Sequence, residues 1–180
     1  NEKNILLKET IEIVSGKIPI IMNIAESSTK KAIESAIIAE KTGASGLMIL
    51  PPMKYKADNR ETVEFFKKIA SKTNLQIMIY NNPVDYGIEV TLSMFEELIS
   101  IKNIVAVKES TRNISNITKM KIKFGDRFKI LAGVDTLALE SLMMKADGWI
   151  AGLVCAFPKE TVAIYELHRV GKIKEALEIY

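Results

Sequence analysis

Apolar and polar residues follow two patterns that take turns along the chain. Short apolar runs rich in Val, Ile and Leu each end in polar, Gly or Pro residues, which is typical of buried strands. We predict six strands within the segments 17–25, 45–52, 75–83, 103–110, 128–135 and 147–154.

The stretches between these runs place apolar residues three and four positions apart, which is typical of amphipathic helices. In "DNRETVEFFKKIASKT", Val63, Phe66 and Ile69 share one helical face. Asp58 is the first residue of this stretch and Glu61 lies three positions after Asp58, which is the pattern of a capping box. We therefore predict a helix that begins just after Asp58.

Strand and helix alternate from one end of the chain to the other, so we expect an α/β fold with a parallel sheet covered by helices. No linker or low-complexity segment interrupts the pattern, and we predict one domain over residues 1–180. A Gly-rich phosphate loop would favour a doubly wound sheet over a barrel, and the sequence has neither G-x-G-x-x-G nor a P-loop. We therefore favour a (β/α)8 TIM barrel, present as an incomplete barrel of about six β/α units.

Composition narrows the class of protein. The 180 residues are 48% hydrophobic and 26% charged, with a net charge of +3, which fits a soluble globular protein rather than a nucleic-acid binder. The single cysteine, Cys155, excludes an internal disulfide, and no apolar run is long enough to span a bilayer. We expect a cytoplasmic protein with no membrane partner. The chain opens on polar residues without Met, so we expect it to begin inside a larger protein.

Polar residues gather where the predicted strands end, which is where sites form in α/β folds. The third strand ends in Tyr80-Asn81-Asn82-Pro83, the fourth in Lys108-Glu109-Ser110, and the fifth in Gly133-Val134-Asp135. Because the third and fourth strands are expected to be neighbours, we predict that Tyr80 and Lys108 share one pocket.

A lysine at the end of a buried strand has two interpretations, a catalytic amine and an ordinary solvated charge. As a free amine, favoured by an apolar interior, Lys108 would attack a ketone to form an imine, and a phenol such as Tyr80 would shuttle the protons. From spacing alone, a solvated strand-end lysine and a packing tyrosine are the commoner outcome. For Glu109 and Asp135, ion pairing or helix capping is favoured over an acid role.

Other reactive side chains carry weaker signals. His168 lies late, on a predicted amphipathic helix without a partner histidine, and we read it as structural. Cys155 has no evident base that would make it a catalytic thiol. No cluster of His, Asp or Glu has metal-ligand spacing, so no metal site is predicted.

The motifs "IYNNP", "NIVAVKES", "FKILAGVD" and "ADGWIAG", in this order, resemble the dihydrodipicolinate synthase/N-acetylneuraminate lyase family. The resemblance implies a (β/α)8 barrel that acts on pyruvate or a related 2-oxo acid through a lysine Schiff base, without a cofactor. It implies that Lys108 is the Schiff-base lysine, that Tyr80 relays protons and holds the bound acid, and that Pro83 closes the tyrosine motif. Lys108 and Tyr80 are therefore the predicted catalytic residues.

The predicted substrate contacts are strand-end residues on three strands. They are Asn82, Pro83, Asp85, Gly133, Asp135 and Ala151.

Departures from the family pattern bear on the substrate and on the completeness of the barrel. The family's carboxylate-binding loop and its first two strands are absent, so we expect an internal fragment or a truncated product that is a homo-oligomer only when full length. Where the synthases carry an arginine for a semialdehyde carboxylate, this chain has Asp85. That change favours the alternative branch that resembles 1-pyrroline-4-hydroxy-2-carboxylate deaminases, which act on a cyclic imine acid in hydroxyproline breakdown.

Two other functions stay open from the sequence. One is a non-catalytic or truncated relative of the barrel enzymes, against which the intact Lys108 and Tyr80 count. The other is a phosphate-binding barrel enzyme, which predicts a Gly-rich loop late in the chain. The segments "GVDTLALE" and "AGLVCAFP" offer little of such a loop.

Overall fold

A computed structural model describes residues 2–52 and 55–180 of the chain. The chain forms two compact units, an N-terminal unit over Asn1–Val105 and a C-terminal unit over Ala106–Tyr180. The prediction of a single partial barrel domain over residues 1–180 stays a prediction.

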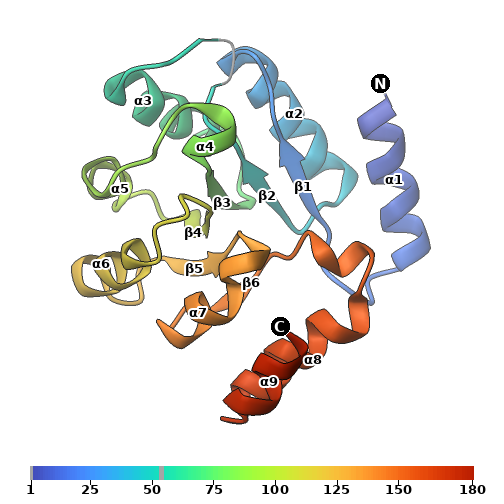
Figure 1. Cartoon of the computed structure of the whole chain (residues 1–180). Coiled ribbons are helices and arrows are strands. Elements are labelled where there is room, and N and C mark those ends of the chain that lie inside the picture. The colour runs from blue at the N-terminus through green and yellow to red at the C-terminus, as the bar shows by residue number, and fades with distance from the viewer. Residues whose placement is uncertain (1, 53–54) are drawn as a thin grey trace. The chain divides into compact units, whose positions relative to one another are not determined.

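The N-terminal unit alternates strands and helices, and its strands β1, β2 and β3 pair in parallel, in chain order (Figure 1). Its elements are α1 (Glu2–Val14), β1 (Ile21–Ile24), α2 (Thr29–Thr42), β2 (Gly46–Ile49), α3 (Asn59–Ala70), β3 (Gln76–Asn81), α4 (Pro83–Tyr86) and α5 (Leu92–Leu98).

The C-terminal unit continues the alternation, and β4, β5 and β6 again pair in parallel, in chain order (Figure 1). Its elements are β4 (Ile104–Glu109, from Ala106 onward in this unit), α6 (Ser115–Phe124), β5 (Lys129–Ala132), the 3-10 turn η1 (Asp135–Leu137), α7 (Ala138–Met143), β6 (Gly148–Trp149), the 3-10 turn η2 (Leu153–Cys155), α8 (Pro158–Arg169) and α9 (Ile173–Ile179).

Helix α3 begins and packs as its sequence predicts. The Asp58 carboxylate accepts a hydrogen bond from the backbone N–H of Glu61 at 2.8 Å, and the Glu61 carboxylate accepts one from the Asp58 N–H at 3.0 Å. This capping box satisfies two of the amide groups that a helix start leaves unpaired. Val63, Phe66 and Ile69 are each at most 1% exposed, so the predicted apolar face is confirmed.

The centre of strand β3 is buried on both faces, as the continuous apolar runs predict. Its consecutive residues Ile77, Met78 and Ile79 are 0%, 7% and 0% exposed, and successive side chains of a strand point to opposite faces. Because strands covered on both sides belong to parallel sheets with helical crossovers, the predicted α/β class is confirmed. Neither unit contains a reversal of strand order, which a doubly wound sheet would need and a barrel does not.

Candidate active site

Lys108 lies next to the last residue of β4, between two residues that are almost fully buried. Val107 is 0% exposed and Glu109 is 7% exposed, while Lys108 itself is half-buried. In the parallel register with β5, Lys108 stands opposite Leu131, and Glu109 stands opposite Ala132. The lysine therefore sits at the carboxyl end of a strand, where α/β folds build their sites.

Gly133, directly after β5, leaves the space that the Lys108 side chain occupies. A Cβ atom at this position would lie 2.8 Å from Lys108 Cγ and 3.0 Å from the Glu109 carbonyl oxygen, and it would collide with Ser110 Oγ. The backbone N–H of Gly133 donates to the Glu109 carbonyl oxygen at 2.9 Å, which holds the two strand ends together. Ser110 is 2% exposed, and its hydroxyl has no hydrogen-bond partner among the described residues.

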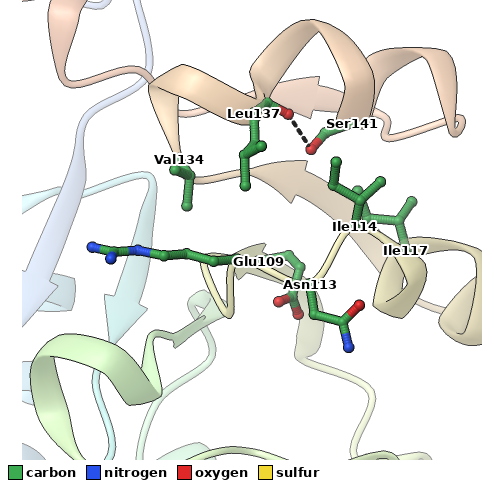
Figure 2. Close-up of a pocket in the computed structure, with 8 residues that line it drawn as sticks. Glu109, Asn113, Ile114, Ile117, Val134, Leu137 and Ser141 are labelled. Carbon is green, nitrogen blue, oxygen red and sulfur yellow. Dashed lines mark hydrogen bonds between the residues drawn. The ribbon is translucent and has the colours of Figure 1, made fainter.

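Glu109 points to a small gap beside the strand rather than to a substrate-sized cavity (Figure 2). Its carboxylate accepts a hydrogen bond from the backbone N–H of Thr111 at 2.9 Å. The gap has a volume of about 10 Å³, room for about one water molecule. Ser141, on its far wall, donates to the Leu137 carbonyl oxygen at 2.6 Å (Figure 2). Glu109 thus helps to fix the loop that follows β4, and the ion-pairing or helix-capping role favoured for it stays a prediction.

Asp135, in the loop after β5, is hydrogen-bonded to the loop after β6 in the C-terminal unit. Its carboxylate accepts hydrogen bonds from Trp149 Nε1 at 3.1 Å and from the backbone N–H groups of Gly152 and Leu153, each at 3.0 Å. Ala151, half-buried, lies within the loop that these bonds fix. The structure therefore gives Asp135 three protein donors, and its predicted contact with a substrate, like that of Ala151, stays a prediction.

In the N-terminal unit, the residues after β3 form a connected polar group. Asn82 Nδ2 donates to the Tyr80 hydroxyl at 3.2 Å and to the Asp85 carboxylate at 2.7 Å. The rings of Tyr80 and Tyr86 pack edge to face with centroids 5.7 Å apart. Burial raises the pKa of Tyr86 above its ordinary value, and the neighbouring Tyr80 and Asp85 add to this effect. The catalytic role predicted for Tyr80 and the substrate contacts predicted for Asn82 and Asp85 stay predictions.

Pro83 and Asn81 fix the path of this segment. Pro83 is the first residue of the short helix α4, where its missing N–H costs nothing, and Gly87 ends that helix with a left-handed backbone. Asn81 is 1% exposed; its Nδ2 donates to the Val90 carbonyl oxygen at 3.1 Å, and its Oδ1 accepts from the Val90 N–H at 2.8 Å. The sequence analysis assigned no role to Asn81. The signal available was an amide at a position where the strand pattern calls for an apolar residue.

Tyr80 belongs to the N-terminal unit and Lys108 to the C-terminal unit. That they share one pocket stays a prediction. His168 is half-buried in the last turn of α8, and Cys155 is exposed. Within residues 2–52 and 55–180, no group of three or more His, Cys, Asp or Glu side chains is arranged to hold a metal ion. No helix in the same described ranges is both long and apolar enough to cross a membrane.

Parallel strands in chain order, with a lysine at a carboxyl strand end, define an α/β-barrel protein with the strand-end layout of barrel enzymes. Residues 1–180 match the Dihydrodipicolinate synthetase family, and the chain belongs to that family. The resemblance found in the sequence is thereby confirmed at the level of the family.

Known relatives agree with this assignment. The chain is 32% identical over 179 residues to 4-hydroxy-tetrahydrodipicolinate synthase 1 of Clostridium acetobutylicum, covering 99% of this chain and 61% of that protein. The solved structure of the 4-hydroxy-tetrahydrodipicolinate synthase from Methylacidiphilum fumariolicum SolV matches 99% of this chain and 60% of its own length, at 30% identity and a TM-score of 0.95. A catalytic lysine mutant of Ruminococcus gnavus sialic acid aldolase matches 98% of this chain and 58% of its own length, at 26% identity and a TM-score of 0.94.

These matches also fix how much of a barrel the chain represents. The chain spans about 60% of the length of these relatives. The predicted fold class is confirmed: the chain is an incomplete barrel of the family, with six strands in its described residues.

Proposed function

We propose that this chain carries the Schiff-base lysine of an aldolase-type lyase that acts on a small 2-oxo acid, and that Lys108 is that lysine. The observation that carries the proposal is the position of Lys108 at the carboxyl end of β4, beside a glycine whose missing side chain makes room for the lysine stem. Support comes from the R. gnavus aldolase, whose structure is described as a catalytic lysine mutant.

The proposed chemistry balances without an added group. The uncharged Lys108 amine attacks the C2 carbonyl carbon of the 2-oxo acid, the carbinolamine loses water, and an iminium forms. The iminium accepts the electron pair released when a bond to the adjacent carbon breaks, or it loses a proton to give the enamine that forms such a bond. Since the imine itself is the electron sink, we propose that no cofactor is needed.

Tyr80 is the proposed proton carrier. A phenol can donate to the carbinolamine oxygen as water leaves and take a proton back during bond cleavage. Asn82 donates a hydrogen bond to the Tyr80 oxygen at 3.2 Å, which orients the phenol. Asn82, Pro83, Asp85, Gly133, Asp135 and Ala151 remain the proposed contacts to the substrate.

A cyclic imine acid is a second candidate substrate, and one observation favours it. Asp85 is exposed beside Asn82 and brings a negative charge to the residues that follow Tyr80. A carboxylate there repels a second anionic substrate, such as the semialdehyde that synthases condense with pyruvate. A deaminase of the hydroxyproline type avoids this repulsion, although the relatives found are named as synthases or as an aldolase.

We also propose that the protein binds a small-molecule substrate and neither nucleic acid nor a membrane. We further propose that it assembles into a homo-oligomer and lies in the cytoplasm.

Borohydride trapping tests the proposal. The protein, expressed with any flanking residues that its gene encodes, is incubated with pyruvate or with the cyclic imine acid, reduced, and weighed by intact mass spectrometry. We expect one added reduced ligand, mapped to Lys108 in a peptide digest and absent from Lys108→Ala. The ligand that is trapped decides between the two substrate classes.

Lys129→Ala is the matched control, because Lys129 is also a strand lysine but lies at the amino end of β5. It should be trapped as the wild type is. An adduct that persists in Lys108→Ala, or none on a wild-type protein shown to be folded by circular dichroism, would contradict the proposal.

A further inference from the structure

Gly133 is a glycine for reasons of space and not of backbone conformation. The glycines with a left-handed φ in the described residues are Gly16, Gly43, Gly87, Gly125 and Gly171, and Gly133 is not one of them. An alanine could therefore adopt the Gly133 backbone without strain. The side chains of two neighbours exclude the added Cβ.

Ser110 Oγ is the nearest atom to that Cβ, and the second neighbour is the stem of Lys108. A Cβ at residue 133 would lie 2.8 Å from Lys108 Cγ, closer than carbon atoms approach one another in folded proteins. Cγ is the second carbon of the side chain, so it cannot yield by a small movement of the far end. The lysine would have to change its χ1 rotamer, and the whole stem would turn with it.

Ser110 forms the other wall of the same space. Residues 108 and 110 lie two positions apart, so their side chains project on the same face of the chain. The Ser110 hydroxyl is fully buried without a hydrogen-bond partner in the described residues, and it also meets the site of the missing Cβ. Leaving a buried hydroxyl unpaired costs stability, which indicates that this space is shaped for something other than packing.

We propose that Gly133 and Ser110 form a seat for the Lys108 stem, and that Gly133 is a positioning residue that sets the direction of the Lys108 amine. This inference rests on the proposed function only for its catalytic consequence. An amine displaced by about 1 Å loses on the order of 100-fold in rate, because attack on a carbonyl requires close alignment.

Two measurements on Gly133→Ala test the seat. In the first, lysines are acetylated with a limiting amount of acetic anhydride, and the labelling of Lys108 relative to Lys102 is read by peptide mass spectrometry. In the second, the initial rate of pyruvate trapping by borohydride is followed. We expect the relative labelling of Lys108 to change several-fold, and trapping to fall on the order of 100-fold.

Gly148→Ala is the matched control. Gly148 is also a strand glycine of the C-terminal unit, and its added Cβ would meet Leu131 Cδ2 at 2.9 Å, the far end of a flexible side chain that can move aside. The control should keep both the labelling pattern and the trapping rate of the wild type.

The double variant Gly133→Ala/Ser110→Gly keeps the test informative if the single variant does not fold. Removing the serine side chain abolishes its collision with the new Cβ and should restore folding, but the contact with Lys108 Cγ remains. We therefore expect recovered stability without recovered trapping.

The outcomes separate the two proposals. If the wild type is not trapped but Lys108 labelling still changes in Gly133→Ala, the seat stands and the proposed function fails. If a folded Gly133→Ala keeps wild-type labelling and trapping, or if the double variant recovers full trapping, the seat is refuted.

Discussion

Asp147 provides the sharpest test of what holds the C-terminal unit together. Its carboxylate accepts hydrogen bonds from the backbone N–H of Ile130 and from Lys121 Nζ, each at 2.8 Å, and Lys129 Nζ lies 3.4 Å away. Ile130 is 1% exposed, so its N–H has no access to water if the carboxylate is removed. Asp147 therefore satisfies a buried donor at the start of β5 as well as forming ion pairs.

The cost of Asp147→Ala follows from these contacts. An unpaired buried N–H costs about 1–3 kcal/mol. Loss of a partly exposed ion pair adds up to about 1 kcal/mol. We expect the free energy of unfolding to fall by about 2–4 kcal/mol in Asp147→Ala. Asp147→Asn, whose amide oxygen can still accept from Ile130, should lose about 1 kcal/mol.

Burial acts to raise the pKa of Asp147, but the hydrogen bonds from Ile130 and Lys121 and the charges of Lys121 and Lys129 outweigh it. The pKa is thus held below its ordinary value of 3.8. The unfolded chain therefore binds more protons than the folded one in acid, so stability falls as the pH drops. The contribution of Asp147 is present above about pH 4 and is lost as the pH falls through the lower folded-state pKa.

Urea unfolding followed by circular dichroism, repeated at several acidic pH values, measures both effects. Asp126→Asn is the matched control, because Asp126 contacts the same Lys121 at 3.7 Å but its side chain is 89% exposed. It should change stability by no more than about 0.5 kcal/mol. The reasoning fails if Asp126→Asn costs as much as Asp147→Ala. It also fails if the difference between wild type and Asp147→Asn does not shrink in acid.

Two further predictions concern single residues of the C-terminal unit. Arg112 has a left-handed backbone with φ of 63° and follows a strand, so Arg112→Gly should be about 1 kcal/mol more stable than Arg112→Ala in the same urea assay, and equal stabilities would contradict this. Burial, with a hydrogen bond to Glu140, raises the pKa of Tyr180 from 10.0 to about 12. Its stabilising effect should be present below pH 10.0 and be lost as the pH rises through about 12. Phenolate absorbance of the wild type minus that of Tyr180→Phe should show this late titration, and a midpoint near 10.0 would refute it.

The hydrophobic pattern was sufficient to locate every strand in the described residues, and it was clearest for β3 and β4, whose mostly buried residues form near-continuous apolar runs. It overstated the last one: the segment 147–154 contains only the two-residue strand β6, followed by the turn η2 (Leu153–Cys155). Asp135 accounts for the difference, because its carboxylate takes the N–H groups of Gly152 and Leu153 that a longer strand would offer to a neighbour. A local sequence pattern cannot predict a hydrogen-bond partner that lies 17 or more residues away.

The sequence was enough to propose the chemistry of the candidate site but not its shape. Lys108 was singled out because a cation directly after four apolar residues conflicts with a plain buried strand, and its catalytic role stays a prediction. The steric role of Gly133 was not visible, because a glycine after a strand usually indicates a turn, and only coordinates show what its missing side chain would touch. Asn81 was missed for a similar reason, since its partner Val90 lies beyond an intervening helix.

The amide of Asn81 has a consequence for redesign. With its two hydrogen bonds to Val90, it ties the chain together where the segment 82–89 leaves the strand and where it returns. Most of that segment is exposed, and it carries Asp85, the residue we connect with substrate choice. A loop anchored at its base can be replaced without a large change in closure entropy. Residues 83–89 can therefore be exchanged as one segment: as a consequence of the proposed function, we expect segments from other enzymes of the family to change substrate selectivity when they replace it, while Asn82 and the register of the strand beneath are kept.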